Sequence, residues 1–182
     1  QKPHRIDPPE GFIATANNNL VPKDYAYREA VGWEWSDPSR FHRLEDVLSS
    51  SKAHTMSDMM ALQTDYVSLP ARTLVPLLKH LRPASQEATL ALEMLADWDH
   101  RLNPDSGPAA IYVAFERRLQ RAVPGVVMSD EAREALGGLP MSMIIDHLVR
   151  PNPSFSGLCE GCTPLDGRDQ LLTNELEAAV EG

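Results

Sequence analysis

Residues 108–122 read PAAIYVAFERRLQRA, and this stretch indicates the fold class of the chain. Proline is favoured at the first position of a helix, where its missing N–H is not needed. The apolar residues that follow, Ile111, Phe115 and Leu119, recur every four residues and therefore lie on one side of a helix. The basic residues of the stretch face water: Arg117, Arg118 and Arg121. The pattern predicts an amphipathic helix that begins at Pro108.

Helical signals of the same kind continue on both sides of this stretch, over residues 37–182. Each candidate helix opens on a capping residue or a proline: Asp37, Thr55, Ser85, Pro108, Ser129, Pro140 and Asp166. Pro70 and Pro76 lack the backbone donor that a helix interior needs, so residues 56–81 must kink or split. Residues 151–167 are predicted as loop. The expected fold class is mainly α, with about seven helices.

The first 25 residues differ from the rest, because residues 1–10 hold three prolines and read as an extended segment. Residues 12–16 are partly β-branched, which predicts one short strand that the asparagines at 17–19 terminate. A lone strand leaves its backbone donors and acceptors unpaired unless a sheet lies elsewhere. The inventory therefore indicates a piece of something larger.

The composition is that of a globular protein and argues against several classes of partner. Of 182 residues, 42% are hydrophobic and 24% are charged, which fits one domain with a sizeable core. The net charge of −9 has the wrong sign for phosphate backbones, so no nucleic acid is expected. No apolar stretch approaches the ~20 residues that cross a bilayer, so no membrane is expected either. The polar N-terminus does not resemble a signal peptide, which leaves a cytosolic protein or a chain that starts downstream of processing.

The two cysteines, Cys159 and Cys162, form a single CxxC motif. Two thiolates cannot complete a tetrahedral zinc site, and no histidine lies nearby at ligand spacing, so no metal or cofactor is expected in this chain. A redox motif usually opens a helix after a strand, a pattern that is missing here. Structural cysteines are therefore favoured over a redox site.

Four blocks of sequence form a pattern that extends over nearly the whole chain. They are Thr15-Ala16-Asn17-Asn18-Asn19 followed by Asp24-Tyr25, Trp33, Arg40, Arg43 and Leu44; Asp58-Met59, Leu62-Gln63, Asp65 and Ser68; Trp98-Asp99 before the proline-led helix; and the final amphipathic helix. Together they resemble the β-subunit of the penicillin acylase family of N-terminal nucleophile hydrolases. The resemblance implies that residues 1–182 are the helical central section of a larger α+β fold.

The resemblance also implies an amidohydrolase that cleaves linear amide bonds of a small-molecule acyl amide through an acyl-enzyme. In the family the nucleophile is a Ser that becomes the first residue of the β-subunit, whereas residue 1 here is Gln. The segment alone is expected to be inactive, with the remaining α- and β-subunit segments as partners. The family is exported, which implies a periplasmic or secreted protein in which Cys159 and Cys162 can pair. The acyl group, from a β-lactam, an acyl-homoserine lactone or a lipopeptide, is not determined by this chain.

Two residues match the family's catalytic positions. The family's asparagine donates its side-chain N–H to the substrate oxygen that becomes anionic, and the matching residue here is Asn17. A neutral amide stabilises an oxyanion without adding a charge whose burial must be compensated. The matching arginine, which holds the asparagine, is Arg40. Several members bind calcium through an Asp in the next loop, but the aligned residue here is the cation Arg28, which argues against a calcium site.

The same residues also have simpler interpretations. Asparagine runs after a strand are most often turn formers. Arg40, in a first helical turn, would ordinarily be solvated or would pair with Asp37 or Asp58. A second hypothesis, of another class, is a non-catalytic helical protein-interaction module whose acidic surface and apolar faces bind a protein partner.

Overall fold

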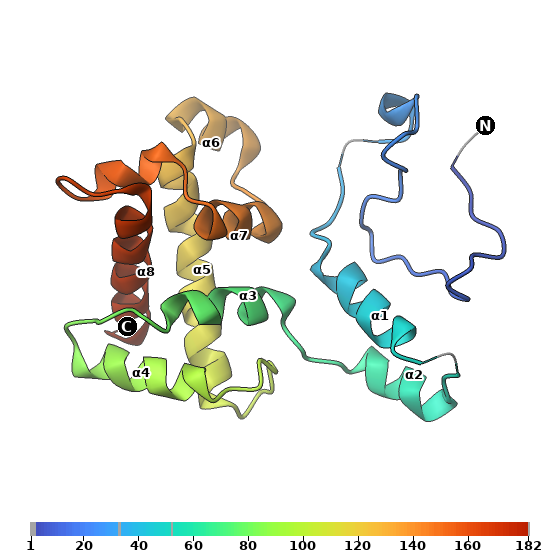
Figure 1. Cartoon of the computed structure of the whole chain (residues 1–182), viewed down its shortest axis with the longest axis horizontal. Helices are drawn as coiled ribbons and strands as arrows, with labels where there is room; N and C mark the ends of the chain where they lie inside the picture. The colour runs from blue at the N-terminus through green and yellow to red at the C-terminus, as the bar shows by residue number, and fades with distance from the viewer. Residues whose placement is uncertain (1–2, 33, 52, 182) are drawn as a thin grey trace. The chain divides into compact units, whose positions relative to one another are not determined.

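The structure is a computed structural model that describes three ranges of the chain: 3–32, 34–51 and 53–181. Trp33 of the first sequence block lies outside these ranges, as does Gln1. The chain divides into two units, Gln1–Asp65 and Tyr66–Gly182, which are described separately. Helices dominate the described secondary structure (Figure 1), which confirms the mainly α prediction.

Eight α-helices and two short 3₁₀-helices occur within the described ranges. Unit 1 contains η1 (Arg28–Ala30), α1 (Ser39–Ser49) and α2 (Met56–Gln63). Unit 2 contains α3 (Leu69–Leu78), α4 (Gln86–Ala96), α5 (Gly107–Val127), α6 (Asp130–Leu136), α7 (Met141–Val149), η2 (Pro153–Leu158) and α8 (Pro164–Glu181). None of the described helices is both long enough and apolar enough to cross a membrane.

The helix predicted at Pro108 is α5, which begins one residue earlier. Phe115 and Leu119 are fully buried, as their spacing predicts. Tyr112 is also fully buried, whereas Ile111 is only half-buried. Near the N-terminus of α5, the buried side of the helix is therefore centred one residue later than the sequence pattern predicts, on Tyr112 instead of Ile111.

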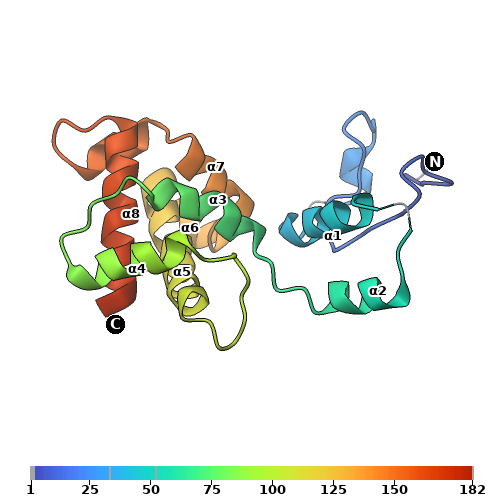
Figure 2. The same ribbon diagram turned by 60° about the horizontal axis from the view of Figure 1, so that its bottom comes forward.

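Unit 2 is built around α5 and α8, which lie side by side (Figures 1 and 2). α4 packs against both of them, and α7 packs against α3 and α5. The largest fully buried side chains come from six of the helical segments: Leu74, Leu78, Leu95, Tyr112, Phe115, Leu119, Val123, Ile144, Leu148, Phe155, Leu172 and Leu176. Unit 2 therefore has a continuous hydrophobic core of its own.

Residues 56–81 form two helices, one of the two outcomes that the prolines predict, which accounts for an eighth α-helix. α2 ends at Gln63, and α3 starts after the N-cap Ser68, whose Oγ accepts a hydrogen bond from the Ala71 N–H (3.1 Å). Pro70 lies in the first turn of α3, where a missing donor does no harm, and Pro76 lies inside this helix.

Capping residues explain where two of the helices begin. Thr55 and Asp58 form a reciprocal capping box, as their spacing predicts: the Asp58 N–H donates to Thr55 Oγ1 (3.2 Å) and the Thr55 N–H to Asp58 Oδ2 (2.7 Å). The prediction that Asp166 is the cap of the last helix is wrong, since α8 starts two residues earlier. Thr163 and Asp166 make the same reciprocal contacts (3.3 Å and 2.9 Å). The predicted loop over 151–167 is also wrong in part, since it contains η2.

The strand predicted at residues 12–16 is wrong. The described ranges contain no strand, and their one pairing of strand type is an isolated antiparallel bridge between Val67 and Arg101. A strand needs a neighbour to complete its hydrogen bonds, and residues 12–16 have none among the described residues. The Ala16 N–H donates instead to Asn18 Oδ1 (3.1 Å), so the chain turns there.

Cys159 and Cys162 form a disulfide between η2 and α8, with their Cα atoms 5.5 Å apart. The family resemblance left the state of these cysteines open, and the structure has them paired. Because the disulfide closes the connection between two segments of unit 2, it fits the structural interpretation of these cysteines.

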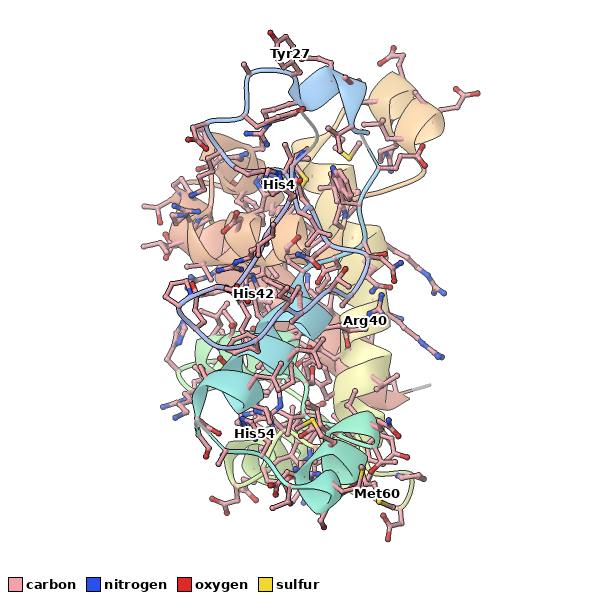
Figure 3. All side chains as sticks on the ribbon, turned by 90° about the vertical axis from the view of Figure 1, so that its right-hand side faces the viewer. His4, Tyr27, Arg40, His42, His54 and Met60 are labelled. Carbon is pink, nitrogen blue, oxygen red and sulfur yellow. A yellow bond between two sulfur atoms is a disulfide. The ribbon has the colours of Figure 1, made fainter. Side chains whose placement is uncertain are left out.

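Unit 1 has almost no apolar core. Among its described residues only Asn18 is buried, with 4% of its surface exposed. Large apolar side chains remain exposed: Ile6, Ile13, Leu20, Tyr27, Val31, Met56 and Met60. Figure 3 shows Tyr27 and Met60 near opposite ends of this unit. Directional polar contacts therefore matter more here than apolar burial.

Candidate active site

The asparagine turn of unit 1, residues 17–19, has an unusual backbone at its first position. Asn17 adopts the left-handed conformation, with φ 62°, which Asn tolerates better than most residues. Its carbonyl oxygen accepts a hydrogen bond from the Ser36 N–H (2.8 Å). This contact ties the turn to the segment before α1 and sets the direction in which the Asn17 side chain leaves the backbone.

Asn18 and Asn19 use their side chains within the turn itself. Asn18 Oδ1 accepts the hydrogen bond from the Ala16 N–H, and Asn19 Oδ1 accepts one from the Val21 N–H (2.9 Å). Both contacts join residues two positions apart. These two asparagines therefore have the turn-forming role that such runs most often have.

The carboxamide of Asn17 reaches α1 instead of folding back into the turn. Its Oδ1 accepts a hydrogen bond from Arg40 Nη2 (3.0 Å), and the same nitrogen donates to the Ala16 carbonyl oxygen (3.0 Å). Figure 3 labels Arg40 on α1, and both side chains belong to exposed residues. The structure thus brings together the two residues, 23 positions apart, that the family resemblance selects.

The arginine determines which end of the Asn17 amide is available. A guanidinium only donates hydrogen bonds, so the amide turns its oxygen towards Arg40. The NH₂ group then points away, and among the described residues it donates to no acceptor. A charged donor on the oxygen also polarises the amide and strengthens its N–H as a donor. An amide held in this way can donate to an oxygen on which negative charge develops.

The start of α1 places Arg40. The prediction that Asp37 caps α1 with Pro38 at the first helical position is one residue out, since the N-cap is Pro38 and α1 begins at Ser39, but the Asp37 carboxylate does accept a hydrogen bond from the Ser39 N–H (3.0 Å). Arg40 lies in the first turn, where side chains tilt towards the helix N-terminus. Its guanidinium therefore extends back to the asparagine turn.

A second arginine of α1, Arg43, makes an ion pair that sequence reasoning missed. Arg43 Nη2 donates to Asp65 Oδ2 (2.7 Å) and Nε to Asp65 Oδ1 (3.3 Å), a two-point contact. The side chains are only 23% and 12% exposed, respectively. The hydrogen bond to Asp65 raises the pKa of Arg43. The sequence did carry one signal, since both residues belong to the blocks that resemble the family.

Two hollows are lined by described residues of unit 1, and Val21 and Trp35 line both. The larger, of about 390 Å³, is completed by mostly apolar residues: Pro3, Leu20, Tyr25, Ala30 and Val31. The smaller, of about 170 Å³, includes Arg28, whose guanidinium donates to the Lys23 carbonyl oxygen (3.3 Å). The larger hollow has the volume of a site for a small organic group. That Arg28 argues against calcium stays a prediction.

Comparison with known proteins finds one family and several relatives. A family model described as penicillin amidase matches residues 1–182. A penicillin acylase 2 proenzyme of Pseudomonas sp. is 34% identical over 122 residues, which are 66% of this chain and 16% of that protein. An acyl-homoserine lactone acylase QuiP of Pseudomonas putida is 32% identical over 133 residues (65% and 16%). Its namesake from Pseudomonas fluorescens is 29% identical over 198 residues (98% and 24%). The chain therefore spans 16% to 24% of the length of these curated relatives.

Proposed function

The chain belongs to the penicillin amidase family, and we propose that it supplies the oxyanion-stabilising amide, Asn17, to an amidohydrolase. The relatives are named as acylases, which supports a hydrolase at the level of the family. The observation that carries the proposal is the 3.0 Å hydrogen bond from Arg40 to Asn17 Oδ1, which leaves the amide N–H facing away as a donor. Two neighbouring asparagines with local partners lack this arrangement.

In the proposed reaction an N-terminal Ser, supplied by sequence outside this chain, adds through its hydroxyl oxygen to the carbonyl carbon of a linear amide. The hydroxyl proton passes to the α-amino group of that Ser. The carbonyl π electrons move onto the oxygen, which becomes anionic and accepts a hydrogen bond from Asn17 Nδ2. Collapse re-forms the C=O bond, breaks the C–N bond and releases the amine, which takes the proton. Water then hydrolyses the acyl ester by the same sequence of steps.

The activity is proposed for the whole protein, because the chain spans only 16% to 24% of its relatives. The remaining α- and β-subunit segments of an N-terminal nucleophile hydrolase would be its partners. A small-molecule acyl amide would be its substrate. We also propose a periplasmic or secreted location, which the Cys159–Cys162 disulfide supports, since disulfides persist in oxidising compartments.

The decisive test replaces Asn17 by Ala in the full-length gene product. Loss of one oxyanion donor lowers turnover by about 100- to 1,000-fold, so kcat should fall by at least about 100-fold. KM should change little, because the donor acts on charge that develops only in the transition state. Turnover is measured on phenylacetyl, glutaryl and long-chain acyl amides, and self-cleavage is followed on gels.

Asn19→Ala is the matched control. It removes an amide of the same kind from the same turn, but one whose oxygen accepts a local hydrogen bond from the Val21 N–H. Turnover should therefore stay near that of the wild type. A folded, self-cleaved Asn17→Ala enzyme that hydrolyses its substrate as fast as the Asn19→Ala enzyme would refute the proposal.

The second candidate function is a non-catalytic protein-interaction module. It is favoured by the exposed apolar side chains of unit 1, such as Leu20, Tyr27 and Met60. A full-length product that is folded, hydrolyses none of the three amides and binds a protein partner through these side chains would favour this alternative.

A further inference from the structure

We propose that Arg43 and Asp65 are positioning residues that orient the Asn17 amide by fixing α1, the helix that carries Arg40. The proposal rests on the proposed function of Asn17. The two hydrogen bonds of the ion pair join Arg43 to Asp65 and involve neither Asn17 nor Arg40. Its effect is transmitted through the helix.

α1 is not anchored by an apolar core. No residue of α1 is fully buried, and the same is true of α2. A short helix gains most of its stability in a protein from packing of an apolar face, which is weak here. Within this chain, directional polar contacts therefore largely determine the rotation of α1 about its own axis.

The Arg43–Asp65 pair is a contact of this kind. Two parallel hydrogen bonds, of 2.7 Å and 3.3 Å, fix both the position and the plane of the guanidinium. Asp65 is held in turn at the end of α2, where its N–H donates to the Leu62 carbonyl oxygen (3.3 Å). The pair therefore joins the side of α1 to the segment that leaves α2.

Helix geometry couples this anchor to Arg40. Residues three apart leave an α-helix about 60° from each other around its axis, so Arg40 and Arg43 move together when α1 rotates. Arg40 Nη2 donates at 3.0 Å to both the Ala16 carbonyl oxygen and Asn17 Oδ1. A rotation that frees Arg43 from Asp65 would lengthen or misalign these bonds, which weaken steeply with angle. The Asn17 amide would then lose its fixed orientation.

The shielding of the pair makes it a stronger anchor than the surface ion pairs of the chain. The side chains of Arg43 and Asp65 are 23% and 12% exposed, against 77% and 67% for Arg150 and Asp146. Exposed pairs of the latter kind contribute little to structure. Removing the charge of Asp65 would leave a partly buried guanidinium without its hydrogen-bonded counter-ion and with only the charge interaction with Asp46, so Arg43 would turn towards solvent.

The first measurement is kcat and KM of Asp65→Asn in the full-length enzyme, on the acyl amide that the wild type hydrolyses fastest. Misplacement of a reacting geometry by about 1 Å costs up to about 100-fold, so kcat should fall by about 10- to 100-fold. KM should stay within about twofold, because the substrate still binds and only transition-state stabilisation is lost. Arg43→Lys, which keeps the charge but loses the two-point contact, should have the same effect to a smaller extent.

The second measurement separates positioning from a merely structural role. In an Asn17→Ala background the amide is absent, so adding Asp65→Asn should lower kcat by no more than about twofold. Glu175→Gln is the matched control, since it breaks another partly shielded ion pair, Arg118–Glu175 (2.8 Å), within unit 2. Its kcat should remain that of the wild type.

Three outcomes would overturn the inference. One is an unchanged kcat in Asp65→Asn when Asn17→Ala is strongly impaired, which leaves the proposed function intact. Another is an equal loss from Asp65→Asn with and without the Asn17 amide, since the effect would not pass through that amide. The third is full turnover in Asn17→Ala, which would refute the proposed function and this inference together. If Asp65→Asn does not fold, Arg43→Lys is judged by the same criteria.

Discussion

Replacement of Gly167 by Ala should destabilise unit 2 strongly. Gly167 lies in the first turn of α8, and a Cβ atom there would be 1.8 Å from the Phe155 carbonyl oxygen and 2.6 Å from its carbon. Both atoms belong to the backbone of η2, and Phe155 itself is fully buried. The obstacle therefore cannot be relieved by moving the end of a flexible side chain.

The expected loss follows from two opposing effects. An ordinary contact begins at 3.4 Å, so η2 and α8 would have to separate by about 1.6 Å at a point where they pack together. Overpacking of a core costs about 1 to 3 kcal/mol, and an obstructing backbone places this case at the upper end. Ala is a better helix former than Gly by about 1 kcal/mol, which offsets part of the loss. The net destabilisation should be about 2 kcal/mol, or about 8 °C in Tm for a unit of about 120 residues.

Thermal unfolding followed by circular dichroism tests this expectation. Gly157→Ala is the control, because Gly157 lies in η2 and a Cβ there meets no atom within 4 Å. It should melt within about 2 °C of the wild type. If Gly167→Ala melts together with Gly157→Ala, the close approach of α8 to the Phe155 carbonyl is incorrect.

Two further predictions concern pH and the arginine of the site. Burial, and then the nearby charge of Arg72, lower the pKa of His100 in the folded chain. The folded chain therefore favours neutral His100, and this contribution to the free energy of unfolding is complete above about pH 6.5 and is lost as the pH falls below that value. His100→Asn is the variant to use, because Asn tolerates the left-handed backbone at this position (φ 61°). When the pH is lowered from about 7.5 to about 5.5, this variant should lose less free energy of unfolding than the wild type. Equal losses in urea titrations would contradict this expectation. Arg40→Lys in the full-length enzyme should lower kcat by about 10-fold, because a flexible ammonium group does not fix the Ala16 and Asn17 oxygens as a planar guanidinium does. Unchanged kinetics would show that Arg40 does not orient the amide.

Local sequence signals predict helix starts better than they predict how helices meet. Thr55, Ser85 and Ser129 are N-caps, as predicted, because the capping contact involves only residues within one turn. The start of α8 was accessible to the same reasoning, since Thr163 and Asp166 repeat the spacing of Thr55 and Asp58. Because glycine and proline are common around Thr163, the composition of this stretch favoured a loop prediction over a capping box.

The strand prediction failed for the opposite reason. A strand is stabilised by hydrogen bonds to a second segment, and the β-branched residues at 12–16 contain no information on whether that segment is present. The buried side of α5 shows a milder form of the same problem. Whether Tyr112 or Ile111 faces inward depends on the neighbouring helices, and Tyr112 packs against Trp98, with ring centroids 5.3 Å apart.

The site shows most clearly what sequence can and cannot predict. Three identical side chains stand in a row, so composition and propensity cannot distinguish a catalytic amide from a turn former. The proposed role of Asn17 rests on its left-handed backbone and on a guanidinium 23 positions away, and only the folded chain combines them. The family resemblance could select Asn17 and Arg40 because it preserves the result of that three-dimensional arrangement. The resemblance assigned no role to the Arg43–Asp65 pair. The positioning role proposed for this pair rests on its shielded hydrogen bonds and on the absence of a fully buried residue in α1, and both of these come from the folded structure.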